Sequence, residues 1–260
     1  MQISPHVYLV GSEQFGLSHP LDCNCYLLDG GSELVLIDTG IGLGIEEIWS
    51  NIERDGFDPH SLAHIFITHS HNGHWGGAEE LRRRTGARIW AHADAAPRMA
   101  DISNDPGIQL NLKFGRYPSG YEPQPCRADV IFEDHLRAGG LDIRVIHIQG
   151  HTKDSVCFLF EDGGKRALAT GDTVFYGGKI GLLNLEGSSL DNYRRDIHKL
   201  ENLGIDMLLP GHGVFTLNRG QRHINRAITK LSDFILPETF FEMNELVWDR
   251  EYLKLMTGAS

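Results

Sequence analysis

Apolar residues along this chain gather in short runs, and turns that contain glycine or polar residues separate the runs. Runs of this kind, bounded by turn residues, are typical of β-strands. They predict strands at residues 7–10, 24–28, 33–37, 63–67, 88–91, 130–132, 141–148, 155–160, 167–170 and 207–209. The first three strands, with a turn at residues 29–32, are expected to form an antiparallel meander, and 155–160 and 167–170 are expected to form a hairpin.

Other stretches place apolar residues at intervals of three or four, which is the spacing of a helix with one buried face. This spacing predicts helices over residues 45–52, 78–84, 190–203, 219–235 and 238–255. Strands that alternate with helices in this way are typical of a layered α/β protein. No linker-like change of composition divides the chain, so we expect one domain over residues 1–260, with C-terminal helices at about 219–255.

Residues 94–128 interrupt the regular pattern, because prolines and glycines are frequent there and neither a helical nor a strand period emerges. We expect an irregular insertion with one short helix near residues 93–101. Phe114, Tyr117 and Tyr121 in this insertion could wall a medium-sized, partly apolar ligand. Long irregular loops are often functional, so a lid over a site and a packed surface loop both stay open.

The charge balance narrows the classes of partner. The chain has 24 basic and 35 acidic residues and a formal net charge of −11. An acidic chain argues against nucleic acid and against anionic membrane surfaces, so we expect a small-molecule substrate. The start of the chain lacks a signal-peptide pattern and no apolar run is long enough to span a membrane, so we expect a cytoplasmic location.

Two groups of residues are expected to have structural roles. The cysteines form no CxxC pair, and we expect them as thiols packed in the core: Cys23, Cys25, Cys126 and Cys157. The last predicted helix carries several large apolar residues: Phe240, Phe241, Leu246 and Trp248. They would either pack on the core or form the contact of a homodimer.

Residues able to bind a metal follow the predicted strands at their ends. The strand at 63–67 leads into the string His69-Ser70-His71-Asn72-Gly73-His74. Four other strands are followed by Asp38, His151, Asp172 and His212. Strand ends in a layered α/β protein meet at one rim, where sites are usually built, and imidazole is a common ligand for zinc and iron. An incidental polar loop would explain one histidine but not this series.

The order of these motifs resembles the metallo-β-lactamase fold superfamily of metal-dependent hydrolases, which includes glyoxalase II, N-acyl homoserine lactonases and the β-lactamases. The resemblance runs from about residue 7 to about residue 213. It implies an α/β (α+β) fold in four layers: an αββα sandwich in which two mixed β-sheets pack face to face, helices flank them, and the site lies on one rim.

The resemblance also implies a role for each residue of the series. A first metal would be held by His69, His71 and His151. His74 and His212 would serve a second metal, and Asp172 would bridge the two. Asp38 would hold the ligand loops by hydrogen bonds from outside the ligand set. Zinc, as one or two ions, is the expected metal, although His/Asp sites also accept iron or manganese.

One position departs from the HxHxDH pattern of the family, because this chain has Gly73 where the family has an aspartate. That aspartate normally binds the second metal and helps to orient the attacking water. We therefore expect a complete first site and a weaker second site. A displaced carboxylate, from Asp38 or Glu79, could swing in, whereas the amide of Asn72 is a poor substitute.

The activity implied by the resemblance is hydrolysis of an ester, thioester, lactone or amide by an activated water. Asp172 would hold that water, and His74 or His212 would deliver a proton to the leaving group. Tyr176, which follows Asp172 closely in the sequence, would either donate to the developing oxyanion or pack at a strand edge.

Two other functions stay open. The first is a mononuclear iron oxygenase of the same superfamily that acts on a sulfur substrate; iron content with oxygen uptake would support it. The second is a non-catalytic binding or regulatory module on a degenerate site, for which Gly73 is the only support. Five retained ligand positions argue against decay, because buried histidines and carboxylates are costly without a metal.

Overall fold

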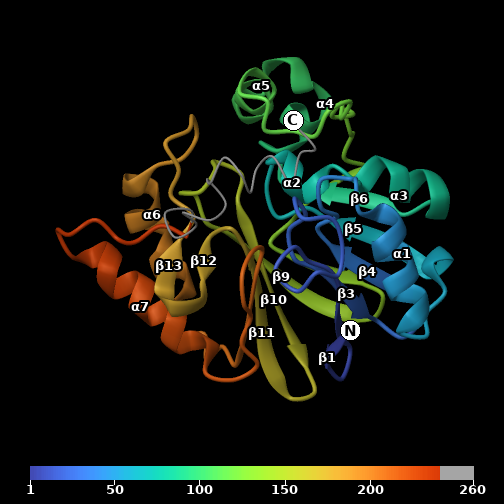
Figure 1. Cartoon of the computed structure of the whole chain (residues 1–260). Coiled ribbons are helices and arrows are strands. Elements are labelled where there is room, and N and C mark those ends of the chain that lie inside the picture. Colours follow the sequence, from blue (N-terminus) through green and yellow to red (C-terminus); the bar gives the residue numbers. More distant parts are fainter. Residues whose placement is uncertain (241–260) are drawn as a thin grey trace.

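Two β-sheets pack face to face, and helices cover the outer face of each (Figure 1). The computed structural model describes residues 1–240. One sheet has seven strands in the order β1-β2-β3-β4-β5-β6-β7, and the other has five in the order β14-β11-β10-β9-β8. The four-layer αββα sandwich expected from the sequence is confirmed.

The first sheet is mixed, because its first four strands pair antiparallel and the next three pair parallel. Its strands are β1 (Gln2–Ser4), β2 (Val7–Gly11), β3 (Cys25–Asp29), β4 (Leu34–Ile37), β5 (Leu62–Phe66), β6 (Arg88–Ala91) and β7 (Val130–Ile131). The predicted meander is β2-β3-β4. Strand β1 was missed because none of its three residues is buried, so it contains no apolar run.

The second sheet is also mixed, with β11 and β14 parallel and its other pairs antiparallel. Its strands are β8 (His135–Ala138), β9 (Leu141–His147), β10 (Val156–Asp162), β11 (Lys165–Gly171) and β14 (Met207–Pro210). A separate two-stranded ribbon pairs β12 (Val174–Phe175) with β13 (Lys179–Ile180). The sequence pattern missed β8, β12 and β13, because β8 alternates exposed and buried residues and the other two are very short.

The apolar side chains form three layers of core that correspond to the interfaces of the sandwich. Phe66 from the first sheet and Phe158 from the second lie in the layer between the sheets. Helices α1 (Ile45–Arg54) and α3 (Ala78–Thr85) cover the first sheet. Helices α6 (Leu190–Asp196) and α7 (Gly220–Ser232) cover the second. The four buried cysteines are free thiols, as expected.

Two predicted helices differ in detail from the structure. The helix expected over 190–203 is α6 followed by the 3₁₀ turn η4 (Ile197–Leu200). The helix expected from residue 238 does not begin there: Thr239 bridges Ile180, and the Phe240 N–H donates to the Ile180 carbonyl. The remainder of that prediction lies outside the described residues. Two further 3₁₀ turns are η1 (Pro59–Ser61) and η3 (Tyr176–Gly178).

The insertion at 94–128 is more helical than the sequence pattern suggested. It contains α4 (Ala96–Ala100), the 3₁₀ turn η2 (Ile102–Asn104) and α5 (Pro106–Lys113). The Asp105 side chain accepts from the Ile108 N–H and caps α5, and Pro106 occupies its first turn. Met99 and Ile108 are buried in the core cluster of the first sheet, so the insertion is anchored on the sandwich. That the whole chain is one domain stays a prediction.

Candidate metal centre

The ligand-capable residues come from one rim of the sandwich. Parallel neighbours β4 and β5 end just before Asp38 and His69, and parallel neighbours β11 and β14 end just before Asp172 and His212. Strand β9 runs in the same direction as β11, because both pair antiparallel with β10, and its end leads to His151. His71 caps the short helix α2 (Asn72–Trp75), which carries His74.

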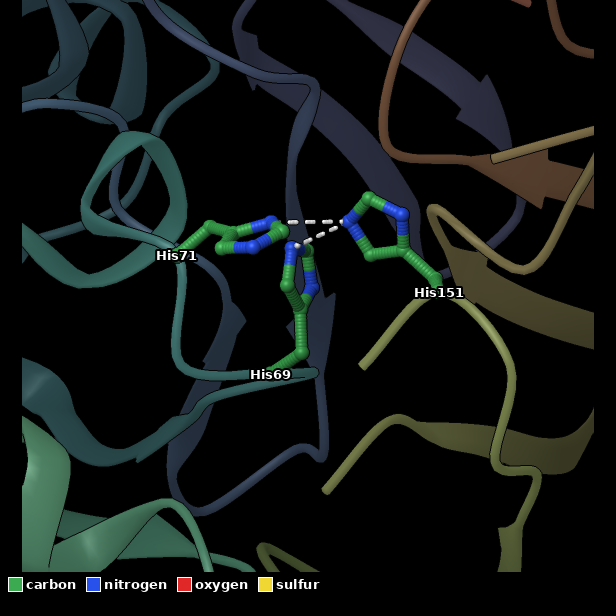
Figure 2. Close-up of side chains that lie close together, drawn as sticks. All are labelled: His69, His71 and His151. Carbon is green, nitrogen blue, oxygen red and sulfur yellow. Dashed lines mark hydrogen bonds between the residues drawn. The ribbon is translucent and has the colours of Figure 1, made fainter. Parts of the chain in front are cut away.

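Three of the histidines form a tight group, which Figure 2 shows. His151 Nε2 lies 2.8 Å from His71 Nδ1 and 3.1 Å from His69 Nε2. One nitrogen from each ring lies within 4.8 Å of the other two. Three ring nitrogens this close to one another form a group that could hold one metal ion.

The Asp172 carboxylate lies in the middle of four imidazoles. Its Oδ2 is 3.4 Å from His151 Nε2, 3.5 Å from His74 Nε2, 3.7 Å from His212 Nε2 and 3.9 Å from His69 Nε2. Asp172 and all of these rings except that of His212 are almost completely buried. The structure therefore brings together the six residues proposed as ligands; their role as ligands stays a prediction.

Hydrogen bonds on the far side of each ring fix which nitrogen faces Asp172. The Thr68 hydroxyl donates to Asp38 Oδ2, so it accepts from His69 Nδ1 at 3.0 Å. His74 Nδ1 donates to Asp38 Oδ2 at 2.8 Å, and His212 Nδ1 donates to Glu13 Oε1 at 3.0 Å.

The fourth ring follows the same arrangement, because His151 Nδ1 donates to the Gly181 carbonyl. Each of these four rings thus turns its Nε2 toward Asp172, which is how supporting partners orient metal-binding histidines.

Asp38 forms hydrogen bonds with residues of the ligand loops, and its supporting role stays a prediction. Its backbone is in the left-handed region with φ 58°, which is costly for a residue other than glycine. Its carboxylate accepts from the Thr68 N–H, the Thr68 hydroxyl and His74 Nδ1. Asp38 thus ties the end of β5 to α2.

Several supporting contacts could not be read from the sequence. The Glu13 and Gly181 contacts join residues remote in the chain. The Asp154 carboxylate accepts from the Ser70 N–H and from the Thr152 hydroxyl, which links the loop of His69 to the loop of His151. No local pattern marks such long-range pairs.

Gly211 allows the backbone of its loop to pass close to Asp172 and His74. A Cβ there would lie 2.5 Å from Asp172 Oδ1 and 2.8 Å from His74 Cε1, and neither buried group can move away easily. The loop that carries Gly211 and His212 is held by Asn24, whose amide donates to the carbonyls of Pro210 and Gly213. A side chain at position 211 would therefore displace the second half of the site.

The pKa values divide the histidines into two groups. Burial lowers the pKa of His69, His71 and His151, and neighbouring imidazoles add to this effect, so these rings are neutral and offer lone pairs. Burial also opposes a charge on His74, but Cys23, Asp172 and Asp38 outweigh it and raise its pKa.

The second group has a carboxylate at its centre. Burial is likewise outweighed at His212, where Asp172 and Glu13 raise the pKa. At Asp172 burial favours the neutral acid, but the imidazoles of His212 and His74 hold the pKa of the carboxyl well below its usual range. Asp172 is therefore an anion surrounded by imidazoles.

The donor set fits a divalent metal ion. Asp172 Oδ1 is buried, and within residues 1–240 no hydrogen-bond donor reaches it. A buried anionic oxygen without a donor is costly, and so is a group of imidazole lone pairs that face one another. A cation among them would relieve both costs, and nitrogen with carboxylate oxygen is a donor set for zinc, iron or manganese.

Gly73 leaves a space beside the second half of the site. A Cβ there would have the Leu21 carbonyl oxygen, at 4.0 Å, as its nearest described neighbour outside its own helical turn. Neither candidate carboxylate fills this space, because Asp38 is bound to His74 and Glu79 pairs with Arg82. The suggestion that one of them swings in is therefore not supported.

The structure does not bring Tyr176 to the site. Strand β12 continues to Phe175, and Gly177, with φ 81°, turns the chain at η3. The Tyr176 ring is half exposed and packs on His223 of α7, with the ring centroids 4.3 Å apart. This contact fits the packing alternative, and no contact among the described residues supports the donation to an oxyanion.

A cavity of about 630 Å³ opens over the metal centre. His71, His74, Asp172 and His212 form its polar floor, together with Gly73. The insertion supplies much of its wall, through α5 and the residues that follow it. Figure 1 shows α5 above α2, where the histidine loop lies.

The insertion is hydrogen-bonded to the histidine loop at a partly buried point. The Tyr121 hydroxyl donates to the Ile41 carbonyl at 2.7 Å and accepts from the Asn72 amide at 2.7 Å. Asn72 lies between His71 and Gly73 in the sequence, so the hydrogen bonds of Tyr121 connect the wall of the cavity to its floor.

Comparison with known proteins matches residues 19–212 to the model of the metallo-beta-lactamase superfamily. The chain belongs to the metallo-beta-lactamase superfamily. Its ligand order, strand-end placement and two mixed sheets are all consistent with this membership.

Solved structures of the superfamily share the fold of this chain. A metallo-beta-lactamase from Cronobacter sakazakii, a mutant of its HARLDQ motif, aligns with a TM-score of 0.68 at 22% identity over 88% of this chain and 93% of its own. A class B3 di-zinc enzyme from an Alaskan soil metagenome aligns with a TM-score of 0.65 at 22% identity, covering 89% of this chain and 90% of its own.

Curated relatives are somewhat more similar in sequence. An atrochrysone carboxyl ACP thioesterase from Aspergillus fumigatus is 26% identical over 85% of this chain and 60% of its own length. A thioesterase from Emericella nidulans is 26% identical over 80% of this chain and 51% of its own. An uncharacterized protein from Mycobacterium bovis is 28% identical over 82% and 95%. The chain thus spans little more than half the length of the thioesterases it matches.

Proposed function

We propose that this superfamily member is a zinc-dependent hydrolase that cleaves the thioester or ester bond of a small molecule. The observation that carries the proposal is the convergence of five imidazoles and Asp172 on the floor of a cavity large enough for a substrate. The thioesterase names of two relatives favour thioesters within the wider class of acyl substrates.

The residues divide the work as follows. His69, His71 and His151 would hold one ion, His74 and His212 would hold a second, more weakly bound one, and Asp172 would bridge the two. A divalent ion in such a site polarises a carbonyl oxygen and lowers the pKa of water. The apolar wall of the cavity excludes other water from the acyl group.

Asp172 and His212 would handle the proton. Asp172 Oδ2 accepts a hydrogen bond from the attacking water and so orients its lone pair toward the carbonyl carbon. When the second half holds no ion, the raised pKa of His212 lets Nε2 carry a proton at the cavity surface. That proton is available to the thiolate or alkoxide that leaves. His212 would thus take over the role of the aspartate that the family pattern has and this chain lacks.

The test is turnover by the purified protein after reconstitution with zinc. We expect thiol release from acyl-pantetheine thioesters, followed by a thiol-reactive dye, and slower cleavage of a lactone and of a β-lactam. Metal bound without cleavage of any ester, thioester, lactone or amide would overturn the proposal. Iron with oxygen uptake would point to the oxygenase alternative, and failure to retain any metal would point to a binding module.

A further inference from the structure

The three histidines proposed for the first ion come from two segments that are remote in the sequence. His69 and His71 lie on the loop after β5, and His151 lies on the loop between β9 and β10. Zinc accepts imidazole nitrogens at about 2.0–2.1 Å, so a site built from two loops requires both loops to be held to a fraction of an ångström. The contacts between the loops therefore decide how well the three nitrogens fit one ion.

One carboxylate oxygen joins the two loops. Asp154 Oδ1 accepts from the Ser70 N–H at 3.0 Å and from the Thr152 hydroxyl at 2.7 Å. Ser70 stands between the two histidines of the first loop, and Thr152 directly follows the histidine of the second. Asp154 is only 1% exposed, so bulk water does not compete for these bonds. A shift of this one side chain would move all three histidines relative to one another.

The Ser70 peptide is held from both sides. Its N–H donates to Asp154, and its carbonyl accepts from the Trp75 indole N–H at 2.8 Å. Trp75 is buried in the core cluster of the first sheet, so this bond fixes the histidine loop to its own sheet. The bond to Asp154 is the one that fixes the same loop to the segment that carries His151.

The second oxygen of Asp154 indicates a role beyond packing. Oδ2 is buried, and within the described part of the chain no hydrogen-bond donor reaches it. A buried charged group in this situation costs free energy, and an asparagine could accept the same two hydrogen bonds without a charge. The carboxylate adds strength, because hydrogen bonds to an anion are about twice as strong as bonds between neutral groups. A costly group is thus retained at the point where the two loops meet.

We propose that Asp154 is a positioning residue whose two hydrogen bonds set the spacing of His69, His71 and His151, and with it the affinity and geometry of the first ion. Asp154 acts through Ser70 and the residue after His151 and is not itself a ligand. This inference rests on the proposed function, because it requires the three histidines to bind zinc.

Asp162 provides a matched control at the other end of β10. Its Oδ1 also accepts two hydrogen bonds, from the His6 N–H at 3.2 Å and from His6 Nδ1 at 2.7 Å. Its Oδ2 is likewise buried without a donor among residues 1–240, and Asp162 is 4% exposed. Asp162 ends β10 whereas Asp154 precedes it, so the length of the strand, roughly 20 Å, separates the two carboxylates.

The experiment compares wild type with Asp154→Ala, Asp154→Asn and Asp162→Ala. Competition with a chromophoric chelator measures the affinity of the tight zinc site. The visible absorption of each protein with one equivalent of cobalt(II), which accepts the same donor types as zinc, reports the geometry around the ion. Thermal unfolding of the metal-free proteins measures the loss of stability.

We expect Asp154→Ala to weaken the tight zinc site about 10- to 100-fold, the usual loss when a group that supports a metal ligand is removed, and to change the cobalt bands. Asp154→Asn keeps both hydrogen bonds in a weaker form and should recover part of the loss. Asp162→Ala should lose stability to a similar extent but bind zinc and cobalt as wild type does.

A further variant applies if Asp154→Ala does not fold. Thr152→Val removes only the bond on the side of His151 and keeps the shape of the side chain. It should weaken zinc binding less than Asp154→Ala is expected to, and it should still change the cobalt bands. A Thr152→Val protein with the affinity and spectrum of wild type would then contradict the inference.

Wild-type zinc affinity and an unchanged cobalt spectrum in Asp154→Ala would overturn the inference, and so would equal losses of affinity in Asp154→Ala and Asp162→Ala. Tight zinc binding by wild type without cleavage of any acyl substrate would remove the proposed function alone, because the affinities and spectra decide the role of Asp154 without turnover. A wild type that has no tight zinc site would remove both.

Discussion

His69, His71 and His151 bring their ring nitrogens together in one half of the metal centre, His74 and His212 form the other half, and Asp172 lies between the halves. In the first half burial keeps the rings neutral, and their lone pairs are ready for an ion. In the second half carboxylates favour the protonated rings, and Gly73 removes a ligand that the family pattern supplies.

The difference shows that imidazoles in one site can differ in protonation, and therefore in how readily they bind a metal ion. A neutral group of histidines binds an ion without releasing a proton, but a protonated pair must release protons first. The first three of the four predictions below test whether the halves differ as their surroundings imply, and the fourth tests how the insertion is linked to the histidine loop.

The largest effect is expected from removal of a ligand of the first half. His69→Ala or His151→Ala should abolish tight zinc binding and lower kcat/KM at least about 1000-fold, because the ion and its polarising effect are lost together. Elemental analysis and thioester turnover measure both losses. His198→Ala is the matched control, since His198 is an exposed histidine that pairs with Glu201. Activity retained by a metal-free variant would contradict the assignment.

Gly73→Asp should make the two halves more alike. The space beside Gly73 accommodates a side chain, and a carboxylate there would restore a ligand. Calorimetric titration of wild type should show one tight zinc site and one weaker site, and the variant should bind the second ion about 10- to 100-fold more tightly, the range typical when a group that supports a metal is gained or lost. Gly73→Asn, which adds a similar volume without charge, controls for packing. Two equally tight sites in wild type would remove the contrast.

The halves should also respond differently to pH. The pKa values of His74 and His212 are raised, which favours the protonated rings, and the second ion must displace these protons in order to bind. Its affinity should therefore rise with pH, by up to about tenfold per unit for each proton released. The rings of the first half have lowered pKa values, so the first ion should bind with little change between pH 6 and 8. Competition with a chromophoric chelator at three pH values measures both slopes, and parallel slopes would contradict the difference.

The smallest effect concerns the link between the insertion and the histidine loop. Tyr121→Phe leaves the Ile41 carbonyl and the Asn72 amide without this partner, which should cost about 1–3 kcal/mol of stability. We expect kcat/KM to fall a few fold, because Asn72 lies beside His71. Thermal unfolding and turnover provide the readouts. Tyr117→Phe is the control and should change little, because within residues 1–240 the Tyr117 hydroxyl has only a long 3.4 Å contact with Asn111.

The sequence was sufficient to predict the elements that have a strong local signal. Apolar runs that end at a histidine or aspartate predicted both the strands and the residues that converge at the rim, because strand direction places such ends together. Helix α5 was missed although Asp105 and Pro106 are a recognisable start signal, since the many prolines around them suggested irregular chain.

The rest depended on contacts between remote segments. The bonds from Glu13 to His212 and from Tyr121 to Asn72 span long stretches of chain, and no spacing rule encodes them. Tyr176 shows the reverse case, because nearness to Asp172 in the sequence suggested a place at the site, whereas its ring packs on His223 of α7. The sequence pattern therefore predicts which reactive residues lie close together better than it predicts the residues that surround them.

The division of labour between the sandwich and the insertion has an evolutionary consequence. The reactive groups stand on strand ends that the whole core maintains, whereas much of the selective surface is encoded in one continuous stretch, residues 94–128. Exchange of that stretch between paralogues could redirect the catalyst to new molecules without disturbing its chemistry. A successful graft would have to preserve the Tyr121 hydroxyl, which forms hydrogen bonds with the Asn72 amide and the Ile41 carbonyl.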